Sequence, residues 1–301
     1  MFYLFGTVIT HYGPASLNHE KARGNVSPLQ KTYWDGHIHS LVSGDAIRWG
    51  LRYTLQKEGY PINRRWNEDE FTNDLVNENF DPVEFVDDDL FGYMYAEAAK
   101  EDIQEEEPSS TGKERRNQTK GSIVQRLGAL GVNRGVSLIP YTGALTFNAK
   151  SGKIKDRTAL HFLEYHNTRY QYTFALDPNH LKVKERILAF IDALMNIRKV
   201  GGNNNVFCYK FTPESFVLCW TQRETPGIFY CFEEGDLIPK MKSEVLEDIE
   251  VGDIKASELW IGGRVAKGLK IKNAHIFRGK EQAIEDLKKV IVKDLELSYP
   301  Y

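Results

Sequence analysis

Runs of apolar residues divide the first sixty positions into a strand, a long polar connection and a helix. Phe2–Tyr12 is aromatic and β-branched and stops at a Gly-Pro pair, which predicts a buried strand. The stretch 15–42 is polar, basic and interrupted by glycines, so we expect a loop. Ser43 then opens a helix of about fifteen residues, whose inward face is marked by apolar residues four positions apart. These residues are Ile47, Leu51 and Leu55.

The middle of the chain alternates between segments with and without a periodic pattern. Residues 60–134 carry no sustained strand pattern, and we predict a partly helical insertion with a mobile loop. Strand patterns return at 135–147 and at 168–176, and these two strands are expected to pair. Between them, 148–167 carries four bases around Gly152, which predicts a protruding basic hairpin.

The last third of the chain begins with an amphipathic helix over 181–199, which the pair Gly201-Gly202 ends. Three short apolar strands are expected after it, over 206–211, 216–221 and 228–232. Residues 240–278 have the pattern of a meander with glycine turns, and 280–295 predicts a charged amphipathic helix at the end of the chain.

The order of these elements is strand, helix, strand, strand, helix, strand, with insertions looped out between them. This βαββαβ order predicts a ferredoxin-like, RRM-like α+β fold, in which an antiparallel sheet carries two helices on one face. The other face would be free for a ligand, and RRM-type domains stack bases on aromatic side chains there. The order alone does not establish RNA binding, because the same fold carries many functions.

Composition changes this picture mainly through the distribution of charge. The chain has 301 residues, of which 41% are apolar, and its formal net charge is −3, which is typical of a globular protein. Residues 66–107 hold 16 of the 42 acids and one base, so the remainder carries 38 bases against 26 acids. An acidic insert therefore interrupts a basic body, and a polyanionic partner is compatible with the charge.

Cysteines and apolar runs bear on the cellular compartment. Cys208, Cys219 and Cys231 are spaced too widely for a zinc knuckle or a redox dithiol, and their apolar neighbours predict buried free thiols in a reducing cytosol. No apolar run approaches the ~18 residues that a membrane span needs. The N-terminal run is broken by Gly6 and Thr7 and is typical of a strand rather than a signal peptide. We therefore expect a cytoplasmic protein that does not insert into membranes.

The first candidate site is the polar loop together with the start of the helix after it. A phosphodiester backbone is bound by cations at adjustable distance and by amide groups at a helix N-terminus. Asp45 in the first turn would repel a phosphate, although it could equally cap the helix. A solvated basic face is the alternative interpretation. The candidate residues are Asn18, His19, Lys21, Arg23, Lys31, Ser43, Arg48 and Arg52.

The second candidate site is the predicted hairpin and its flanks. Between Lys113 and Thr173 there are eleven bases and three acids, with aromatic residues among them. Cations and stacking surfaces together are what single-stranded nucleic acid requires. Alternatively, the aromatic side chains pack in the sheet and the lysines only solubilise the loop. The candidates of this region include Lys150, Lys153, Phe162 and Arg169.

Two groups of histidines are candidates for metal binding or RNA cleavage. His37 and His39 would lie on one side of an extended segment, but no third ligand nearby completes a metal site. His161, Glu164 and His166 form a denser group, yet no second catalytic partner stands at an evident spacing. We predict no catalytic histidine.

The run Asp87-Asp88-Asp89 could bind Mg²⁺, but its acidic surroundings favour a solvated face. The glycines of RLGALGVNRG lack the GK[ST] ending of a phosphate-binding loop. The sequence therefore predicts no metal site and no cofactor.

Four segments in this order resemble one known family. They are LNHEKARGNVSPLQKT, VSGDAIRWGLR, RGVSLIPYTGALTFNA and EYHNTRYQYTFAL. They are similar to segments of the backbone subunit of the CRISPR Cascade effector, the Cas-seven family, and in particular of its DevR branch in type I-B systems. The resemblance covers residues 1–235. It implies a hand-like molecule with an RRM-like palm, a fingers insertion after the first helix and a β-hairpin thumb between the second and third strands.

The resemblance also implies boundaries along the chain. They are 1–59 for the first part of the palm, 60–134 for the fingers-like insertion, 135–147 for a palm strand, 148–167 for the thumb hairpin, 168–239 for the second part of the palm and 240–301 for the C-terminal meander and helix.

In that family several copies polymerise along one CRISPR RNA (crRNA), and each thumb displaces a base. The resemblance therefore implies four kinds of partner: crRNA, the target DNA strand through the RNA–DNA heteroduplex, other copies of the chain and other Cascade subunits. Asn18, His19 and Arg23 match the palm loop along the guide. Ser43, Arg48 and Arg52 match the helix that grips its phosphates. The thumb residues would be Lys150, Lys153, Leu160 and Phe162, the last two beside the displaced base.

The resemblance implies a subunit that does not cut. Related subunits of type III complexes cleave target RNA with a palm-loop aspartate, whereas this loop offers only Glu20 and Asp35. Two other functions stay open. One is a guide-processing endoribonuclease of similar fold that acts through His19, His161 or His166, and the other is a stand-alone DevR-type regulator that binds protein or DNA.

Overall fold

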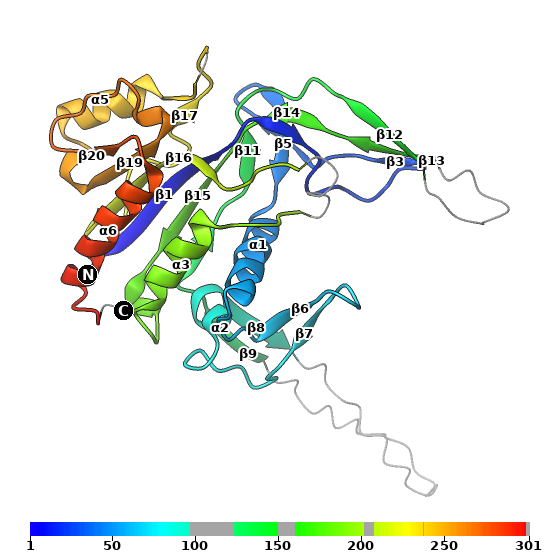
Figure 1. Ribbon diagram of the computed structural model, residues 1–301, viewed down its shortest axis with the longest axis horizontal. Helices are drawn as coiled ribbons and strands as arrows, with labels where there is room; N and C mark the ends of the chain where they lie inside the picture. Colours follow the sequence, from blue (N-terminus) through cyan, green and yellow to red (C-terminus); the bar gives the residue numbers. More distant parts are fainter. Residues whose placement is uncertain (97–122, 150–159, 202–207, 237, 299–301) are drawn as a thin grey trace, which may run out of the picture.

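The computed structural model describes residues 1–96, 123–149, 160–201, 208–236 and 238–298. It is a mixed α/β molecule built around one large twisted sheet, with three helices in a row across one face (Figure 1). The basic hairpin extends from one end of the sheet and the insertion that follows the first helix extends from the other (Figure 1).

The central sheet has nine strands, and its first strand in sequence lies near the middle. The order across the sheet is β20-β19-β16-β1-β15-β11-β5-β4, and β10 also pairs with β15. Neighbours are antiparallel except for the parallel pair β19 and β20. The strands are β1 (Tyr3–Thr10), β4 (Lys31–Trp34), β5 (His37–Val42), β10 (Leu130–Val132), β11 (Gly135–Ser137), β15 (Tyr170–Leu176), β16 (Pro213–Thr221), β19 (Leu259–Gly263) and β20 (His275–Phe277).

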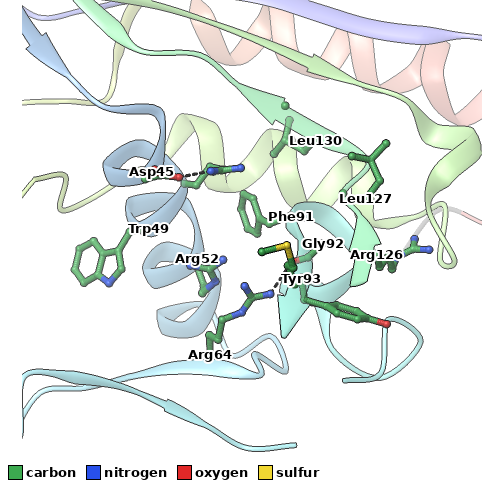
Figure 2. A pocket seen from close by; sticks show the side chains of 14 residues that line it. Asp45, Trp49, Arg52, Arg64, Phe91, Gly92, Tyr93, Arg126, Leu127 and Leu130 are labelled. Carbon is green, nitrogen blue, oxygen red and sulfur yellow. Dashed lines mark hydrogen bonds and ion pairs between the residues drawn. The ribbon is translucent and has the colours of Figure 1, made fainter. Parts of the chain in front are cut away.

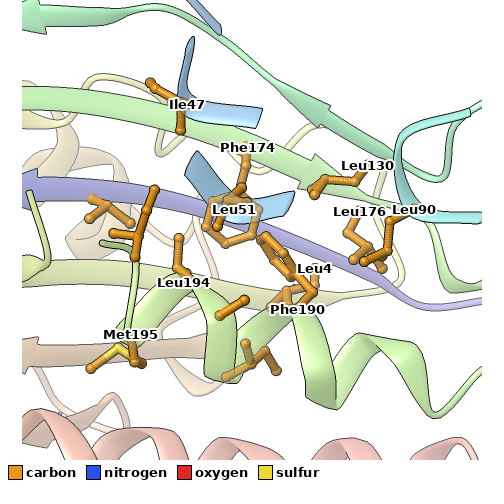
Figure 3. Close-up of a cluster of buried hydrophobic side chains, with 14 of the residues drawn as sticks. Leu4, Ile47, Leu51, Leu90, Leu130, Phe174, Leu176, Phe190, Leu194 and Met195 are labelled. Atoms are coloured by element: carbon orange, nitrogen blue, oxygen red, sulfur yellow. The ribbon is translucent and has the colours of Figure 1, made fainter. Parts of the chain in front are cut away.

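Three helices cover one face of this sheet: α1 (Gly44–Lys57), α3 (Arg186–Met195) and α6 (Lys280–Asp294). Leu4 and Val8 of β1 point into the layer beneath them, where Leu51 and Phe190 are also buried (Figure 3). Burial of each such side chain contributes about 2 kcal/mol to stability. The helix after Ser43 and the one over 280–295 are confirmed, whereas the helix expected over 181–199 spans only Arg186–Met195 and ends before Gly201.

The opposite face of the sheet is covered as well. Phe5 and Ile9 pack there in a second core with α5 (Ser243–Val251) and the short pair β17 (Phe232–Glu233) and β18 (Lys240–Met241). The side chain of Gln171 donates a hydrogen bond of 3.1 Å to the carbonyl of Phe232, which fixes this cover to β15. The prediction of a free sheet face is therefore wrong, because the C-terminal third of the chain occupies it. A base cannot stack on the part of the sheet that this cover occupies, whereas Tyr33 and Ile38 at the β4–β5 edge are 75% and 52% exposed.

The four strands expected from the sequence lie side by side as β16-β1-β15-β11, with α1 and α3 on one face. The predicted pairing of the second and third strands is confirmed by Val136 opposite Gln171. The second strand is much shorter than the predicted 135–147. It ends at Ser137, and the chain then turns away from the sheet before it enters the hairpin.

The described residues of the insertion, 60–96 and 123–134, contain more strand than helix, contrary to the prediction. They form two antiparallel ribbons, β6 (Arg64–Asn67) with β7 (Thr72–Leu75) and β8 (Gly92–Ala96) with β9 (Ile123–Leu127). One short helix, α2 (Val86–Phe91), lies between them. The ribbon β6–β7 has a polar sequence and a largely exposed surface, so it lacks the apolar alternation that marks a buried strand. The strands β8 and β9 are rich in apolar residues but only five residues long. The last part of the predicted insertion, β10, belongs to the central sheet.

The predicted hairpin is present and forms a sheet of its own. β12 (Leu145–Ala149) pairs with β13 (Leu160–Glu164), and β13 also pairs in parallel with β3 (Val26–Ser27) from the polar loop. Beside its base, β2 (Gly13–Ala15) pairs with β14 (His166–Thr168). The stretch 15–42, expected as a loop, thus contributes four strands or parts of strands.

The C-terminal third departs from the predicted meander through α5, whose last turn ends at Gly252 in the left-handed region with φ 93°. The expected strand 216–221 is confirmed within β16, and that of 228–232 is reduced to the start of β17. Residues 206 and 207 lie outside the described residues, and 208–211 form no strand. Three 3₁₀ turns complete the described elements: η1 (Pro178–His180), η2 (Ala256–Glu258) and η3 (Arg264–Ala266).

Candidate nucleic-acid interface

Asn18 and Ser43 join the polar loop to the start of α1. Asn18 has φ 57°, and its backbone amide donates to Gly201 O at 2.8 Å. Ser43 is the N-cap: its hydroxyl accepts from the amide of Ala46 at 3.2 Å and donates to the side-chain oxygen of Asn18 at 3.3 Å. Both residues were predicted to bind RNA. Their observed contacts shape the loop and cap the helix, which is a positioning role.

The outer part of the loop carries its accessible cations. Lys21 is exposed, and the Arg23 side chain is 79% exposed while it forms an ion pair of 3.0 Å with Glu20. An exposed pair of this kind is worth little, about 0–1 kcal/mol, so Arg23 can exchange Glu20 for a phosphate at small cost. His19 lies behind them, with its Nε2 3.0 Å from the Ser16 hydroxyl, and burial lowers its pKa.

The Lys31 side chain is partly buried against the base of the hairpin, where it pairs with Glu164. Its ammonium group is bonded to Glu164, which also accepts the Leu29 amide at 2.8 Å, and lies 4.6 Å from the centre of the Tyr141 ring. Burial alone would raise the pKa of Glu164, but these hydrogen bonds outweigh it and hold that pKa below its usual value. The prediction that Lys31 contacts RNA is not supported by this arrangement. Lys31 instead fastens the loop to the hairpin.

The two arginines of α1 differ in their surroundings, although both were expected to grip guide phosphates. Arg48 is 37% exposed and pairs with Asp45 in the first turn. Arg52 is 13% exposed; its Nε lies 3.1 Å from Asp87, and its guanidinium lies over the Phe91 ring. Burial lowers the pKa of Arg52 to about 10. Arg48 remains a candidate phosphate ligand, whereas Arg52 is a structural cation.

A cavity of about 630 Å³ opens between α1 and the insertion (Figure 2). Trp49 lines it from α1 and stacks on Tyr53, with the ring centres 5.3 Å apart. Met94 and Leu127, which are 76% and 82% exposed, lie on the ribbon β8–β9. The cavity thus combines cations with apolar and aromatic walls. Four of its lining residues are arginines: Arg48, Arg52, Arg64 and Arg126.

Behind this cavity the three aspartates of α2 are fully buried, so the prediction of a solvated acidic face is wrong. Asp87 bonds Arg52, Asp88 bonds the guanidinium of Arg64 at 3.2 Å, and Asp89 bonds Arg126 at 2.7 Å and Arg186 at 2.8 Å. The aspartates are flanked by Phe85, Val86, Leu90 and Phe91, and a charged triplet inside an apolar run is the signal that could have indicated burial. This charge cluster attaches the insertion to the central sheet and its helices.

The hairpin presents aromatic and aliphatic side chains outward. Leu145 is 57% exposed and Phe147 is 56% exposed. Phe147 lies directly opposite Phe162 in the ladder, with ring centres 5.7 Å apart in an edge-on arrangement. Phe162 is therefore close to an exposed ring, as a base-contacting role would require. Leu160 begins β13, while Lys150 and Lys153 lie outside the described residues.

Arg169, the remaining candidate, is buried next to the first residue of β15. Its Nε lies 2.8 Å from Glu214 and its Nη1 lies 2.7 Å from Glu234, and its side chain is 7% exposed. Its guanidinium also lies 5.2 Å from the centre of the Tyr12 ring. Burial and two carboxylates leave no access for RNA, so the prediction that Arg169 binds crRNA is wrong.

The histidines considered for catalysis are bound to neutral groups. His161 Nε2 lies 3.0 Å from the Ser27 hydroxyl, and His39 Nδ1 lies 2.6 Å from Ser137 O. His166 is buried with its Nδ1 2.8 Å from the Ser40 hydroxyl. Within the described part of the chain no group of three or more His, Cys, Asp or Glu side chains is placed to hold a metal.

The pH dependence of stability follows from His166. Burial, together with the neighbouring His39, lowers the pKa of His166 to about 4. The unfolded chain takes up this proton below about pH 6.5, so the stability contribution is complete above that pH and is lost as pH falls toward 4. We expect the wild type to lose about 2 kcal/mol more than His166→Asn between pH 7.5 and 4.5 in urea unfolding. Equal losses would contradict the neutral buried histidine.

The three cysteines differ in their exposure. Cys219 and Cys231 are buried, and burial raises the pKa of each thiol to about 12. Cys208 is exposed, which corrects the prediction that all three thiols are buried. Among the described residues, none of the helices combines the length and the apolar character that crossing a bilayer needs.

The fold has counterparts among solved structures. A chain of a "CRISPR RNA-guided surveillance complex, pre-nicking" superposes with a TM-score of 0.59 and 9% identity, covering 96% of this chain and 100% of that one. A chain of another "CRISPR RNA-guided surveillance complex" gives a TM-score of 0.54 and 12% identity, covering 96% and 99%. The overall fold of this chain is thus similar to the folds of these two chains.

Sequence comparison identifies the family. The chain is 33% identical over 294 residues to the CRISPR-associated protein Cas7/Cst2/DevR of Myxococcus xanthus (strain DK1622), which covers 93% of this chain and 92% of that protein. It belongs to the Cas7/Cst2/DevR family, as the four sequence segments predicted. No protein-family model matches the chain.

Proposed function

We propose that this chain is the RNA-binding backbone subunit of a type I Cascade effector, and that it polymerises along crRNA. The observation that carries the proposal is the end-to-end similarity to a Cas7/Cst2/DevR protein, together with a fold found in RNA-guided surveillance complexes. In this proposal the strands β16-β1-β15-β11 with α1 and α3 are a ferredoxin-like palm. The insertion is the fingers and the hairpin β12–β13 is the thumb.

The proposed contacts are sequence-independent. Lys21, Arg23 and Arg48 hold guide phosphates, since they are the accessible cations of the loop and of the start of α1. Phe147 with Phe162 behind it provides an aromatic surface at the edge of the hairpin for the displaced base. The remaining bases face outward and pair with the target DNA strand, so the heteroduplex supplies the specificity.

Contacts between copies would come from the parts that project from the palm. The hairpin and the ribbon β8–β9 extend away from the sheet at opposite ends and carry exposed apolar side chains (Figure 1). A filament along RNA requires that the hairpin of one copy contacts the neighbouring copy. Other Cascade subunits would cap the filament, and the assembly would be a cytoplasmic ribonucleoprotein.

We further propose that the subunit does not cut nucleic acid. General acid–base cleavage of RNA uses a histidine that can exchange a proton near neutral pH, and burial keeps His166 far from that range. His19 and His161 are each bonded to a serine hydroxyl, and no observation favours a guide-processing role for them. A monomer that ignores added guide RNA would favour the DevR-type regulator instead.

The test is co-purification of RNA without nuclease treatment. The wild type is expected to elute as large assemblies with a raised 260/280 nm absorbance ratio, and sequencing should return crRNA. The triple variant Lys21→Ala, Arg23→Ala, Arg48→Ala removes three phosphate contacts. For single strands it should lower the slope of log K against log salt by about 2 and weaken binding at least about tenfold.

The matched control removes three exposed lysines from the C-terminal part, Lys240→Ala, Lys255→Ala and Lys289→Ala. It loses the same charge and should keep RNA and the large assemblies. A nucleic-acid-free monomeric wild type would contradict the proposal. Equal loss of RNA in both triple variants would show that net charge, rather than the loop and α1, determines binding.

A further inference from the structure

A second group of cations gathers where β1, β16 and β19 meet the start of α6. None of its members belongs to the loop, to α1 or to the hairpin. We call it the C-terminal cationic face. Its residues are Lys210, Arg264, Lys267, Arg278 and Lys280.

These cations are close enough to repel one another. A cavity of about 350 Å³ is lined by Arg264, Lys267 and Arg278, with Ile238 and Gly263 as the other walls. Burial lowers the pKa of His11, and the charges of Lys210, Lys280 and Arg264 lower it further. Burial likewise lowers the pKa of Lys280, with Lys210 adding to the shift. One continuous positive surface thus runs from η3 to the first turn of α6.

Nearby carboxylates do not neutralise this surface. Glu214 is 3% exposed and is shared between Arg169 at 2.8 Å and Arg264 at 3.5 Å. Glu281 lies beside Lys280 and offsets part of its charge. Among the described residues, Glu214 and Glu281 are the carboxylates that act on Lys280, and Glu214 is shared with Arg169. Arg264 keeps 64% of its side chain exposed, and Lys210, Lys267 and Arg278 are exposed as well.

Two polar residues lie beside members of this face: His11 is within reach of the charges of Lys210, Lys280 and Arg264, and Thr212 lines a separate cavity together with Lys210. Among the described residues, His11 Nε2 and Thr212 Oγ1 are buried without a hydrogen-bond partner. Helix α6 begins after Gly279, which provides no side-chain cap for the first amide groups. A bound oxyanion would accept hydrogen bonds from such donors. Buried polar groups are normally satisfied, so their state here is consistent with a ligand at this surface.

The composition of the face identifies the kind of partner. The cores of protein–protein interfaces are rich in aromatic residues and poor in lysine, whereas nucleic-acid interfaces are polar and strongly positive. Three of the five cavity walls are cationic, and none is aromatic. We propose that the C-terminal cationic face binds the phosphate backbone of the target DNA, separately from the crRNA interface. This inference rests on the proposed Cascade function.

The test uses the RNA-loaded complex purified with wild-type protein and with the variant Lys267→Glu, Arg278→Glu. Fluorescence anisotropy measures binding of fluorescein-labelled single-stranded DNA, complementary or unrelated to the guide, over a salt series. The variant should keep its RNA content but bind both DNAs at least about tenfold more weakly. Its salt slope should fall by about 1 to 2, because two contacts with a single strand are lost.

The control variant Lys255→Glu, Lys289→Glu makes the same charge change elsewhere on the C-terminal part and should bind DNA as the wild type does. Unchanged DNA affinity and salt slope in the Lys267, Arg278 variant would overturn the inference. Loss of another protein subunit with unchanged DNA binding would overturn it too and would identify a protein-docking surface. A wild-type protein that purifies without RNA would instead refute the proposed function. Binding of unrelated DNA would still test the C-terminal cationic face, because that binding does not depend on the guide.

Discussion

Replacing Asp89 by asparagine is expected to lower the free energy of unfolding by about 3–5 kcal/mol, the largest effect of any single change considered. The carboxylate is fully buried and bonds Arg126 and Arg186, while it also accepts the amides of Lys182 at 2.9 Å and Val183 at 3.2 Å. An amide side chain cannot balance two guanidinium charges. Arg186, 8% exposed, would be left as an uncompensated buried cation.

Urea unfolding followed by circular dichroism measures this loss. Glu244→Gln is the matched control, since it removes a carboxylate whose side chain is 74% exposed and 3.7 Å from Lys242. The control should change stability by less than about 1 kcal/mol. A double variant, Asp89→Asn with Arg186→Met, should recover part of the loss because it removes the unpaired charge. Similar stability of Asp89→Asn and the control would contradict a buried charge cluster.

Gly50→Ala is expected to destabilise the fold by about 3 kcal/mol, although alanine is the better helix former by about 1 kcal/mol. A methyl group at this position of α1 would clash with the carbonyl oxygen of Lys199 and lie 2.8 Å from the Val200 side chain. The first of these is backbone and cannot rotate away. The segment after α3 would have to move off α1, and the Asn18 amide bound to Gly201 would move with it.

Gly131→Ala is the natural comparison. Its methyl group would meet only Ala175 O, at 3.9 Å, an ordinary contact. Thermal unfolding should therefore place Gly131→Ala near the wild type and Gly50→Ala well below it. If Gly50→Ala were neutral or stabilising, helix propensity would outweigh the close approach of the two segments.

Local patterns in the sequence predicted those elements whose side chains have one buried face. Ile47, Leu51 and Leu55 are buried as their four-residue spacing predicts, and Ser43 caps the helix. The same kind of pattern indicated strands at the positions of β1, β11, β15 and β16. One local signal was overlooked: Asp35-Gly36, with φ 47° and 79°, forms the tight turn between β4 and β5. An Asp-Gly pair between short extended segments is a strong hairpin signal.

Long-range charge pairing could not be predicted from the sequence. The partners of the α2 aspartates are Arg52, Arg64, Arg126 and Arg186, which come from four separate parts of the chain. Nothing local distinguishes these arginines from Arg23 or Arg48, which are accessible. The same holds for Lys31 and Arg169, whose basic side chains meet Glu164 and Glu214 only in the folded molecule. For this reason the cations predicted to bind RNA include several whose side chains are instead engaged in ion pairs inside the folded molecule.

The central position of β1 has a consequence for biosynthesis. Leu4 pairs with Leu176 on one side and with Trp220 on the other, so the first strand made must wait for two partners made much later. At about 5–20 residues per second, the ribosome needs about 10–40 s to deliver them. During that time an apolar β-forming segment of the nascent chain is exposed. Chaperone binding to this segment would keep the chain from aggregating until the sheet closes around it.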